Sequence, residues 1–276
     1  MNMLEIAVIQ VMDHGPDERV SGMGNVRDLL VALDCSTTAS KAVVFDASGH
    51  TVAVGRSPIR LHQPGPGMHE QDPDSWWSAT CAAIGQAMAQ VATERIAALC
   101  ITTQRETFVC VDDQDRPIYP GILWMDTRAR GLVAELGSTR VHELSGRPPD
   151  NTPSLYKIAW LLRHRPEAMA RARHLADVSA YLHHRLVGRW VASSASADCI
   201  GLFDMTRMAW SDELVAHIGL DATLLPEVVA PGEQIGLLDA SAAQLTGLPV
   251  GTPVIAGAGD GQCAALGAGV HAFGGL

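Results

Sequence analysis

The sequence predicts an α/β protein built on a mixed sheet that opens with a β-meander. Three apolar segments at 29–34, 42–46 and 51–54 are separated by short polar turns, which is typical of consecutive antiparallel strands. Strand-like and helical segments then alternate along the rest of the chain, without an internal repeat. With 276 residues and a hydrophobic fraction of 47%, the chain is long enough to bury a sizeable core.

Further strands and helices follow from apolar patterning and from capping signals. Continuous apolar runs at 96–103, 107–111 and 253–258 predict strands, the first of them buried on both faces. Asp72 before Pro73 predicts a helix that runs to about residue 91. Helical spacing of apolar residues and further acidic caps predict the remaining helices, at 127–136, 155–163, 177–186, 213–218, 240–246 and from 262 onward. We expect residues 190–210 to be irregular.

Composition excludes several classes of protein. Charged residues make up 18% of the chain and the mean hydropathy is +0.11, which is typical of a folded globular protein. No apolar run approaches the roughly 20 residues that cross a bilayer. The net charge of −10 argues against nucleic acid or an anionic membrane as a partner. We therefore expect no nucleic-acid and no membrane partner, and a homo-oligomer stays open.

The cysteines and the N-terminal segment indicate the cellular compartment in which the protein is found. Six scattered cysteines without a C-x-x-C pair predict buried thiols in a reducing, cytoplasmic environment. No recurring ligand spacing surrounds His183 and His184, so we expect them on a helix surface rather than at a metal. Residues 1–27 have no basic segment before their apolar patch, which argues against a secretory signal. We expect a loose extension there and a folded domain over 28–276.

The first candidate site spans residues 34–41. Asp34 ends a buried strand, and the turn after it is rich in small hydroxyl residues, among them Thr37 and Thr38. Such turns let backbone N–H groups approach a phosphate, and a carboxylate oxygen is a ligand that Mg²⁺ prefers. Lys41, one of only two lysines, would add positive charge. The alternative is a hydroxyl-rich hairpin with an exposed lysine.

The second candidate site follows the predicted strand at 96–103. Arg105 and Glu106 lie at its end, where ligands bind in open α/β sheets, and together they could hold a polyol. Trp124 and Asp126 would add an aromatic wall beside a carboxylate. The alternatives are a surface ion pair at the strand end and a helix cap at Asp126.

The third candidate site lies at the start of the last predicted helix. Asp260 stands between Gly259 and Gly261, directly after the strand at 253–258. Flanking glycines permit close approach of a substrate, and the helix dipole favours an ionised carboxylate that can accept a proton. The alternative is a simple N-cap aspartate.

Together and in this order, these segments resemble the FGGY carbohydrate kinases, the family of glycerol kinase and xylulokinase. The resemblance covers about residues 29–270 and implies a ribonuclease-H-like (actin-like ATPase) fold. The segments that carry it are 33–41, Glu70-Gln71-Asp72-Pro73 with Trp76-Trp77, 104–107, 124–128, Ser145-Gly146, 155–161, 247–254 and 259–262.

The resemblance also implies a role for each segment, with ATP and Mg²⁺ as cofactors. Asp260 would be the general base that takes the proton of a substrate hydroxyl, and Asp34 would organise Mg²⁺. Thr37, Thr38 and Lys41 would lie near the transferred phosphoryl group. The residues that would contact a small sugar or polyol are Gln104, Arg105, Glu106, Trp124, Asp126, Gly261 and Gln262.

Three departures from the family pattern bear on function. Ser36 replaces the usual glycine, so its turn must avoid left-handed backbone angles. Thr152 stands about where glycerol kinases carry a substrate-contacting tyrosine, which favours a longer polyol or a ketose over glycerol. The family's second domain, which binds the adenine nucleotide, is expected to be absent from this chain.

These expectations lead to two main hypotheses for the function of the chain. The first is ATP-dependent phosphorylation of a sugar or polyol hydroxyl, with this chain supplying the sugar-binding and catalytic-base half. The second is a truncated, catalytically inactive sugar-binding remnant. A third candidate, another actin-like ATPase or a polyphosphatase, would share the Asp-Thr-Thr type of turn but would not need the segment at 104–106.

Overall fold

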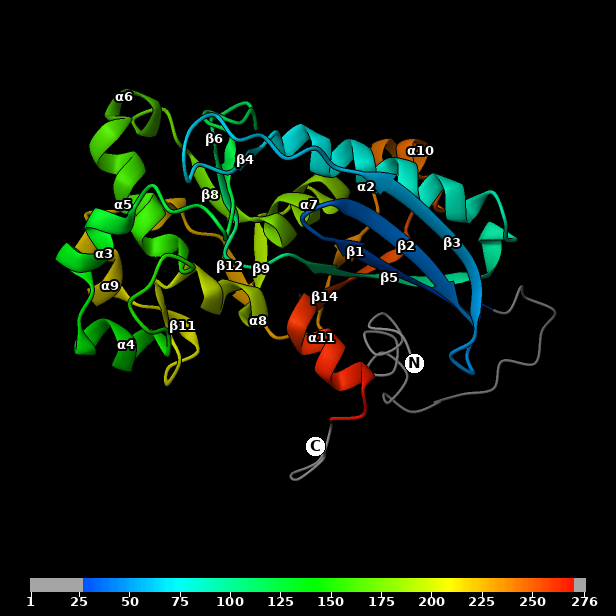
Figure 1. The fold of residues 1–276 in the computed structure, drawn as a ribbon. Coiled ribbons are helices and arrows are strands. Elements are labelled where there is room, and N and C mark those ends of the chain that lie inside the picture. The colour runs from blue at the N-terminus through cyan, green and yellow to red at the C-terminus, as the bar shows by residue number, and fades with distance from the viewer. Residues whose placement is uncertain (1–26, 271–276) are drawn as a thin grey trace.

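A computed structural model describes residues 27–270, and its largest element is a six-stranded mixed sheet (Figure 1). The strand order across the sheet is β13 (Gln234–Leu237), β14 (Pro253–Gly259), β5 (Ile96–Thr103), β1 (Leu29–Cys35), β2 (Ala39–Phe45) and β3 (Thr51–Pro58). The first three strands in the sequence form the antiparallel meander, and β5 and β14 run parallel to β1. The prediction of an α/β, ribonuclease-H-like fold with an initial meander is confirmed.

Strand direction determines where the candidate sites meet. Because β1, β5 and β14 are parallel neighbours, their carboxyl ends lie at one edge of the sheet. Asp34, the segment after Thr103, and Asp260 each stand at one of these three strand ends. Sites that are far apart in the sequence are thereby brought together.

One face of the sheet packs against three helices, α2 (Pro73–Met88), α7 (Val178–Val187) and α10 (Ala240–Thr246) (Figure 1). The predicted start of α2 is confirmed, because the Asp72 carboxylate accepts from the Asp74 N–H and Pro73 opens the first turn. Its end at Met88 falls three residues before the predicted one. The last helix, α11 (Asp260–Gly267), begins directly after β14 on the other side of the sheet (Figure 1).

A second core lies beside the main sheet, where five helices gather (Figure 1). Its helices are α3 (Arg130–Leu136), α4 (Thr139–Ser145), α5 (Ser154–His164), α6 (Pro166–Met169) and α9 (Asp212–Ile218). A four-stranded sheet joins this core, in the order β4 (Glu70–Gln71), β7 (Gly121–Ile122), β6 (Phe108–Val111) and β8 (His174–Asp177). Three further short elements are η1 (Thr93–Arg95), η3 (Ala222–Leu224) and β12 (Glu227–Val229).

The prediction that residues 190–210 are irregular is wrong. The segment holds five short elements: β9 (Val191–Ser193), α8 (Ser194–Ala197), η2 (Asp198–Ile200), β10 (Phe203–Asp204) and β11 (Ala209–Trp210). Ser193 caps α8 by accepting from the Ala195 N–H, and β9 pairs with β12. Elements of two to four residues are too short to show a hydrophobic period, which is why the sequence pattern missed them.

The expected surface position of the histidine pair is also wrong. His183 is fully buried and its Nδ1 lies 2.8 Å from the Val191 carbonyl oxygen, because α7 packs against β9. His184 is partly buried, with its ring stacked on Trp190 at 4.0 Å between centroids.

Other predictions from composition can be compared with the described residues. All six cysteines are free thiols, and five of them are buried, as predicted. Within residues 27–270, no helix has the length and apolar character needed to cross a membrane. The expected loose extension, residues 1–27, lies outside the described part of the chain except for its last residue.

Candidate active site

The charges of two carboxylates, Asp34 and Asp260, interact where β1 and β14 end. Burial and then the charge of Asp260 raise the pKa of Asp34 to about 6, while the attraction of Lys41 works against this rise. Lys41 stands opposite Asp34 in the β1–β2 ladder. The structure therefore brings three predicted residues, Asp34, Lys41 and Asp260, into one electrostatic environment.

Asp34 has the chemistry expected of a cation ligand. Its Oδ1 is buried and, among the described residues, has no hydrogen-bond partner. An orphaned carboxylate oxygen of this kind fits Mg²⁺. No cluster of three or more His, Cys, Asp or Glu side chains gathers within residues 27–270 to hold a metal. A cation on Asp34 would therefore take most of its other ligands from phosphate oxygens and water.

The raised pKa makes Asp34 a source of instability at neutral pH. The folded protein keeps a proton on Asp34 up to about pH 6, whereas an unfolded chain releases it near 3.8. The loss in the free energy of unfolding is therefore absent below about pH 4 and grows as the pH rises to 6. Above pH 6 it amounts to roughly 3 kcal/mol. We expect Asp34→Asn to raise the melting temperature by several degrees at pH 7.5 and to lose this gain at pH 4.

Asp46→Asn provides the control, measured by the same thermal unfolding. The pKa of Asp46 is lowered by backbone hydrogen bonds from His50 and Ser48, so removing its charge should not stabilise the chain at pH 7.5. Equal melting temperatures for Asp34→Asn and the wild type at pH 7.5 would contradict this account of the pair.

Asp260 is the first residue of α11, and Gly259 rather than Asp260 is the N-cap. The Asp260 Oδ1 accepts from the Gly261 N–H at 2.7 Å, and Gln262 Oε1 accepts from the Gly259 N–H at 2.8 Å. A Cβ built on Gly261 would meet no atom within 4 Å. Gln262 thus supports the turn, while Gly261 leaves space beside the carboxylate for a substrate.

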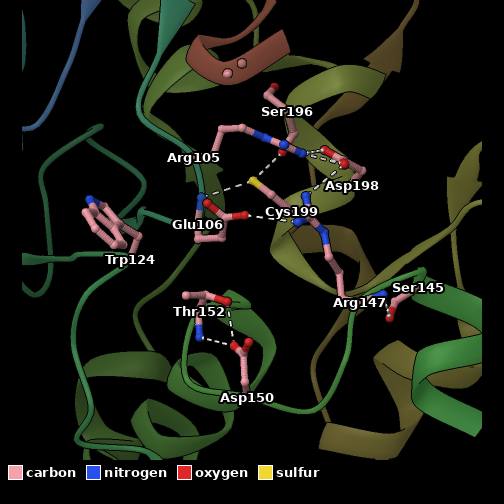
Figure 2. A network of polar contacts seen from close by, with 12 residues as sticks. Arg105, Glu106, Trp124, Ser145, Arg147, Asp150, Thr152, Ser196, Asp198 and Cys199 are labelled. Carbon is pink, nitrogen blue, oxygen red and sulfur yellow. Dashed lines mark hydrogen bonds and ion pairs between the residues drawn. The ribbon is translucent and has the colours of Figure 1, made fainter. Parts of the chain in front are cut away.

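Figure 2 shows a partly buried ionic network around Arg105 and Glu106. The Arg105 guanidinium donates to the Asp198 carboxylate. Arg147 also reaches Asp198, at 3.0 Å, and lies 3.3 Å from the Glu106 carboxylate. Attraction between these positive and negative charges holds Arg105, Arg147 and Glu106 together. Their hydrogen-bond donors and acceptors are the kinds of group that bind hydroxyl groups.

Sequence reasoning missed Asp198 and Arg147. Asp198 lies 93 residues from Arg105, in the segment expected to be irregular. Its only local signal was an acid beside a cysteine in a polar stretch, which is too common to point to a site. Arg147 follows the Ser145-Gly146 pair of the resemblance and could have been found from that position.

Gly259 links the ionic network to Asp260. A Cβ at this position would come within 2.2 Å of the Arg105 Cδ, so the Arg105 side chain lies directly against the Gly259 backbone. Only glycine permits this approach. The Arg105 side chain therefore packs beside the residue that precedes Asp260, and the second and third candidate sites are one site.

Glu106 is held in an uncommon backbone conformation. Its φ of 54° lies in the left-handed region that non-glycine residues seldom adopt, and its N–H donates to Cys199 Sγ at 3.1 Å. Burial raises the pKa of the Glu106 carboxyl group, while Arg105 and Arg147 oppose the rise. Strain of this kind is often found at ligand sites, where surrounding contacts enforce it.

Trp124 forms an exposed aromatic wall that is connected to the turn after β1. Its side chain is 39% exposed, and its Nε1 donates to Thr37 Oγ1 at 3.1 Å. Thr37 Oγ1 in turn donates to Gln104 Oε1, and the buried Gln104 donates to Gln71. Gln104 and Thr37 thus join the aromatic wall to the turn, and Thr38 is left as the exposed hydroxyl residue of that turn.

Asp126 does not face the site. Its side chain is fully buried, and its two oxygens accept from the backbone N–H groups of His69 and Arg128 and from the Arg128 guanidinium. With four donors bound, it has no free oxygen for a sugar. It is also not a helix cap, because α3 begins at Arg130. Asp126 therefore connects the loop that contains His69 with the loop that contains Arg128.

The turn at Ser36 behaves as predicted. Among the described non-glycine residues, positive φ angles occur only at Glu106, Asp115 and Met208. Ser36 closes its turn instead through bonds from its N–H and its hydroxyl to the Ala39 carbonyl.

Comparison with known proteins shows which family the chain is similar to. The N-terminal domain of the FGGY family of carbohydrate kinases matches residues 29–267. A xylulose kinase from Streptomyces rubiginosus is 37% identical over 251 residues, which cover 88% of this chain and 50% of the relative. A glycerol kinase from Thermococcus onnurineus is 32% identical over 86% of this chain and 49% of its own length.

The solved structure of a xylulose kinase from Rhodospirillum rubrum superimposes with a TM-score of 0.85 at 28% identity, over 88% of this chain and 51% of that one. The chain spans about half the length of the curated relatives it matches. Because the family model matches residues 29–267, which is most of the sequence, the chain belongs to the FGGY family of carbohydrate kinases.

Proposed function

We propose that this chain binds a sugar or polyol and supplies the general base for ATP-dependent phosphorylation of one of its hydroxyl groups. The observation that carries the proposal is the contact of Arg105 with Gly259, the residue before Asp260. Through Asp198 and Arg147, Arg105 belongs to the same ionic network as Glu106. Hydroxyl-binding groups and a candidate base then face one ligand.

The chemistry follows from these positions. Arg105 and Arg147 would donate to hydroxyl oxygens, Glu106 would accept from hydroxyl protons, and the Trp124 ring would lie against the carbon skeleton. Asp260 would accept the proton of the reacting hydroxyl, whose oxygen forms a bond to the γ-phosphorus of ATP as the bond to the leaving ADP breaks. Positioning and charge neutralisation contribute most of the catalysis in such transfers.

Asp34, Thr38 and Lys41 would serve the phosphate side of the reaction. Mg²⁺, when bound, neutralises charge on the phosphate groups. Asp34 offers its unpartnered Oδ1 to that cation, Thr38 offers an exposed hydroxyl, and Lys41 offers positive charge. Thr37 would act here indirectly, because its hydroxyl is bonded to Trp124 and Gln104.

We propose a ketose such as xylulose, or a longer polyol, as the substrate. Xylulose kinases are among its relatives, and Thr152 bonds back to Asp150 where glycerol kinases are expected to carry a tyrosine. The free thiols agree with a cytoplasmic location, and the net charge of −10 with the absence of nucleic-acid and membrane partners.

Calorimetry on the 276-residue chain with D-xylulose and glycerol tests the sugar site. We expect D-xylulose to bind, and Glu106→Gln to weaken its affinity by about 10-fold because the variant loses a charged acceptor. Glu213→Gln on α9, which breaks an exposed ion pair with Arg140 on α4, is the control and should keep wild-type affinity. If neither sugar binds to the wild-type chain, the proposed site is wrong.

A further inference from the structure

The second of the two lysines in the chain is buried under the sugar site. Lys157 lies on α5 and is fully inaccessible to solvent. Its Nζ donates to main-chain carbonyl oxygens of Thr152 at 2.8 Å, Glu106 at 3.0 Å and Leu123 at 3.2 Å, and lies 3.5 Å from that of Trp124. The ammonium is thus bound by backbone rather than by a carboxylate.

These carbonyls come from three separate segments. One is the loop after β5 that carries Glu106, one is the loop after β7 that carries Trp124, and one precedes α5 and contains Thr152. Figure 2 shows side chains from the three segments, with Glu106 between Trp124 and Arg147 and with Thr152 below. One ammonium group therefore joins three segments that line the proposed sugar site.

The contact with Glu106 acts on its strained backbone. The carbonyl that Lys157 binds belongs to the residue with φ of 54°, and the N–H of the same residue is held by Cys199. Hydrogen bonds to its N–H and to its carbonyl oxygen hold Glu106 in the left-handed region, and its carboxylate lies 3.3 Å from Arg147.

The burial of this charge disfavours a purely structural role. Burial lowers the pKa of Lys157 to about 8, against the attraction of Asp126 and Glu106. The charged form is therefore disfavoured in the folded protein, and an apolar side chain would fill the same space without that penalty. Buried charges of this kind are concentrated at functional sites.

We infer that Lys157 is a positioning residue for sugar binding, whose ammonium group ties the three loops together so that Glu106 and Trp124 face one ligand. This inference rests on the proposed function for the identity of the ligand. The loop geometry itself can be tested without any ligand.

The first test is amide hydrogen exchange of Lys157→Met, which keeps the length of the side chain and removes the three N–H donors. We expect exchange at least tenfold faster at the amides of Glu106, Trp124 and Thr152, and unchanged exchange in β1 and β2. Ile158→Ala is the control, because it removes the neighbouring buried side chain of the same helix and leaves the Lys157 hydrogen bonds to these loops in place. Wild-type exchange at all three amides of Lys157→Met would overturn the inference.

The second test is the affinity for D-xylulose, measured by calorimetry on folded protein. We expect Lys157→Met to bind at least tenfold more weakly and Ile158→Ala to bind as the wild type does, even where its melting temperature is lower. Equal affinities for Lys157→Met and the wild type would overturn the inference while leaving the proposed function intact. Absence of binding to the wild type would instead remove the proposed function.

A third measurement needs no variant and remains available if Lys157→Met does not fold. In the wild-type chain, saturation with D-xylulose should slow exchange in the three loops together, since they are joined at one ammonium. Protection of only one loop, with the other two unchanged, would overturn the inference.

Discussion

Asp260→Asn is expected to lower turnover by about 10²–10⁴-fold in a protein that joins this chain to a nucleotide-binding domain of the family. The amide cannot accept the hydroxyl proton, whereas its size and its bond from the Gly261 N–H can be kept. The affinity for D-xylulose should therefore change less than about threefold. Steady-state kinetics with ATP and D-xylulose, combined with calorimetry, measures both effects.

Asp239→Asn is the matched control for this experiment. Asp239 also begins a helix, since it caps α10 and accepts from the Ala242 N–H, but it lies away from the strand ends that form the site. Its substitution should leave turnover unchanged. Equal turnover for Asp260→Asn and the wild type would refute the role given to Asp260. Sugar binding by a wild-type fusion that never turns over would favour the inactive sugar-binding alternative.

Asp198→Asn is expected to weaken D-xylulose binding by roughly 30-fold or more. Asp198 neutralises both Arg105 and Arg147, and its loss would leave two partly buried guanidinium groups close to each other. Repulsion should then move Arg105 away from Gly259 and Arg147 away from Glu106. Calorimetry gives the affinity, and thermal unfolding should show a lower melting temperature.

A lower melting temperature alone would not identify a role in the site, so Asp112→Asn is measured beside it. Asp112 forms an ion pair with Arg116 at a turn after β6, outside the network of Figure 2. This control should lose some stability and keep its sugar affinity. If both variants bind D-xylulose as the wild type does, the ionic network is not part of the sugar site.

Much of the fold could be predicted, because its elements are long and periodic. The strands at 96–103 and 253–258 are buried between neighbours and read as continuous apolar runs, and α2 carries both a cap and a proline at its start. Short elements could not be predicted in this way. The three residues of β9 and the four of α8 are stabilised by pairing and by Ser193, rather than by a pattern of their own.

For the site, the sequence indicated the segments that carry candidate functional residues. It did not indicate what each side chain contacts in the fold. Asp34, Arg105 and Asp260 lie at one edge of the sheet, because the carboxyl ends of parallel strands share an edge. Gln104 and Asp126 are buried instead, with their polar atoms bound by neighbouring loops. Such roles depend on contacts between distant segments, which spacing along one segment does not reveal.

We propose that one sugar lies between Asp260 and the ionic network that contains Arg105 and Glu106. A crystal structure of this chain with D-xylulose tests it most directly. We expect sugar hydroxyls within hydrogen-bond distance of Arg105 and Glu106, the Trp124 ring against the carbon chain, and one terminal hydroxyl bonded to the Asp260 carboxylate. A sugar bound elsewhere, or bound here with every hydroxyl out of reach of Asp260, would contradict the claim.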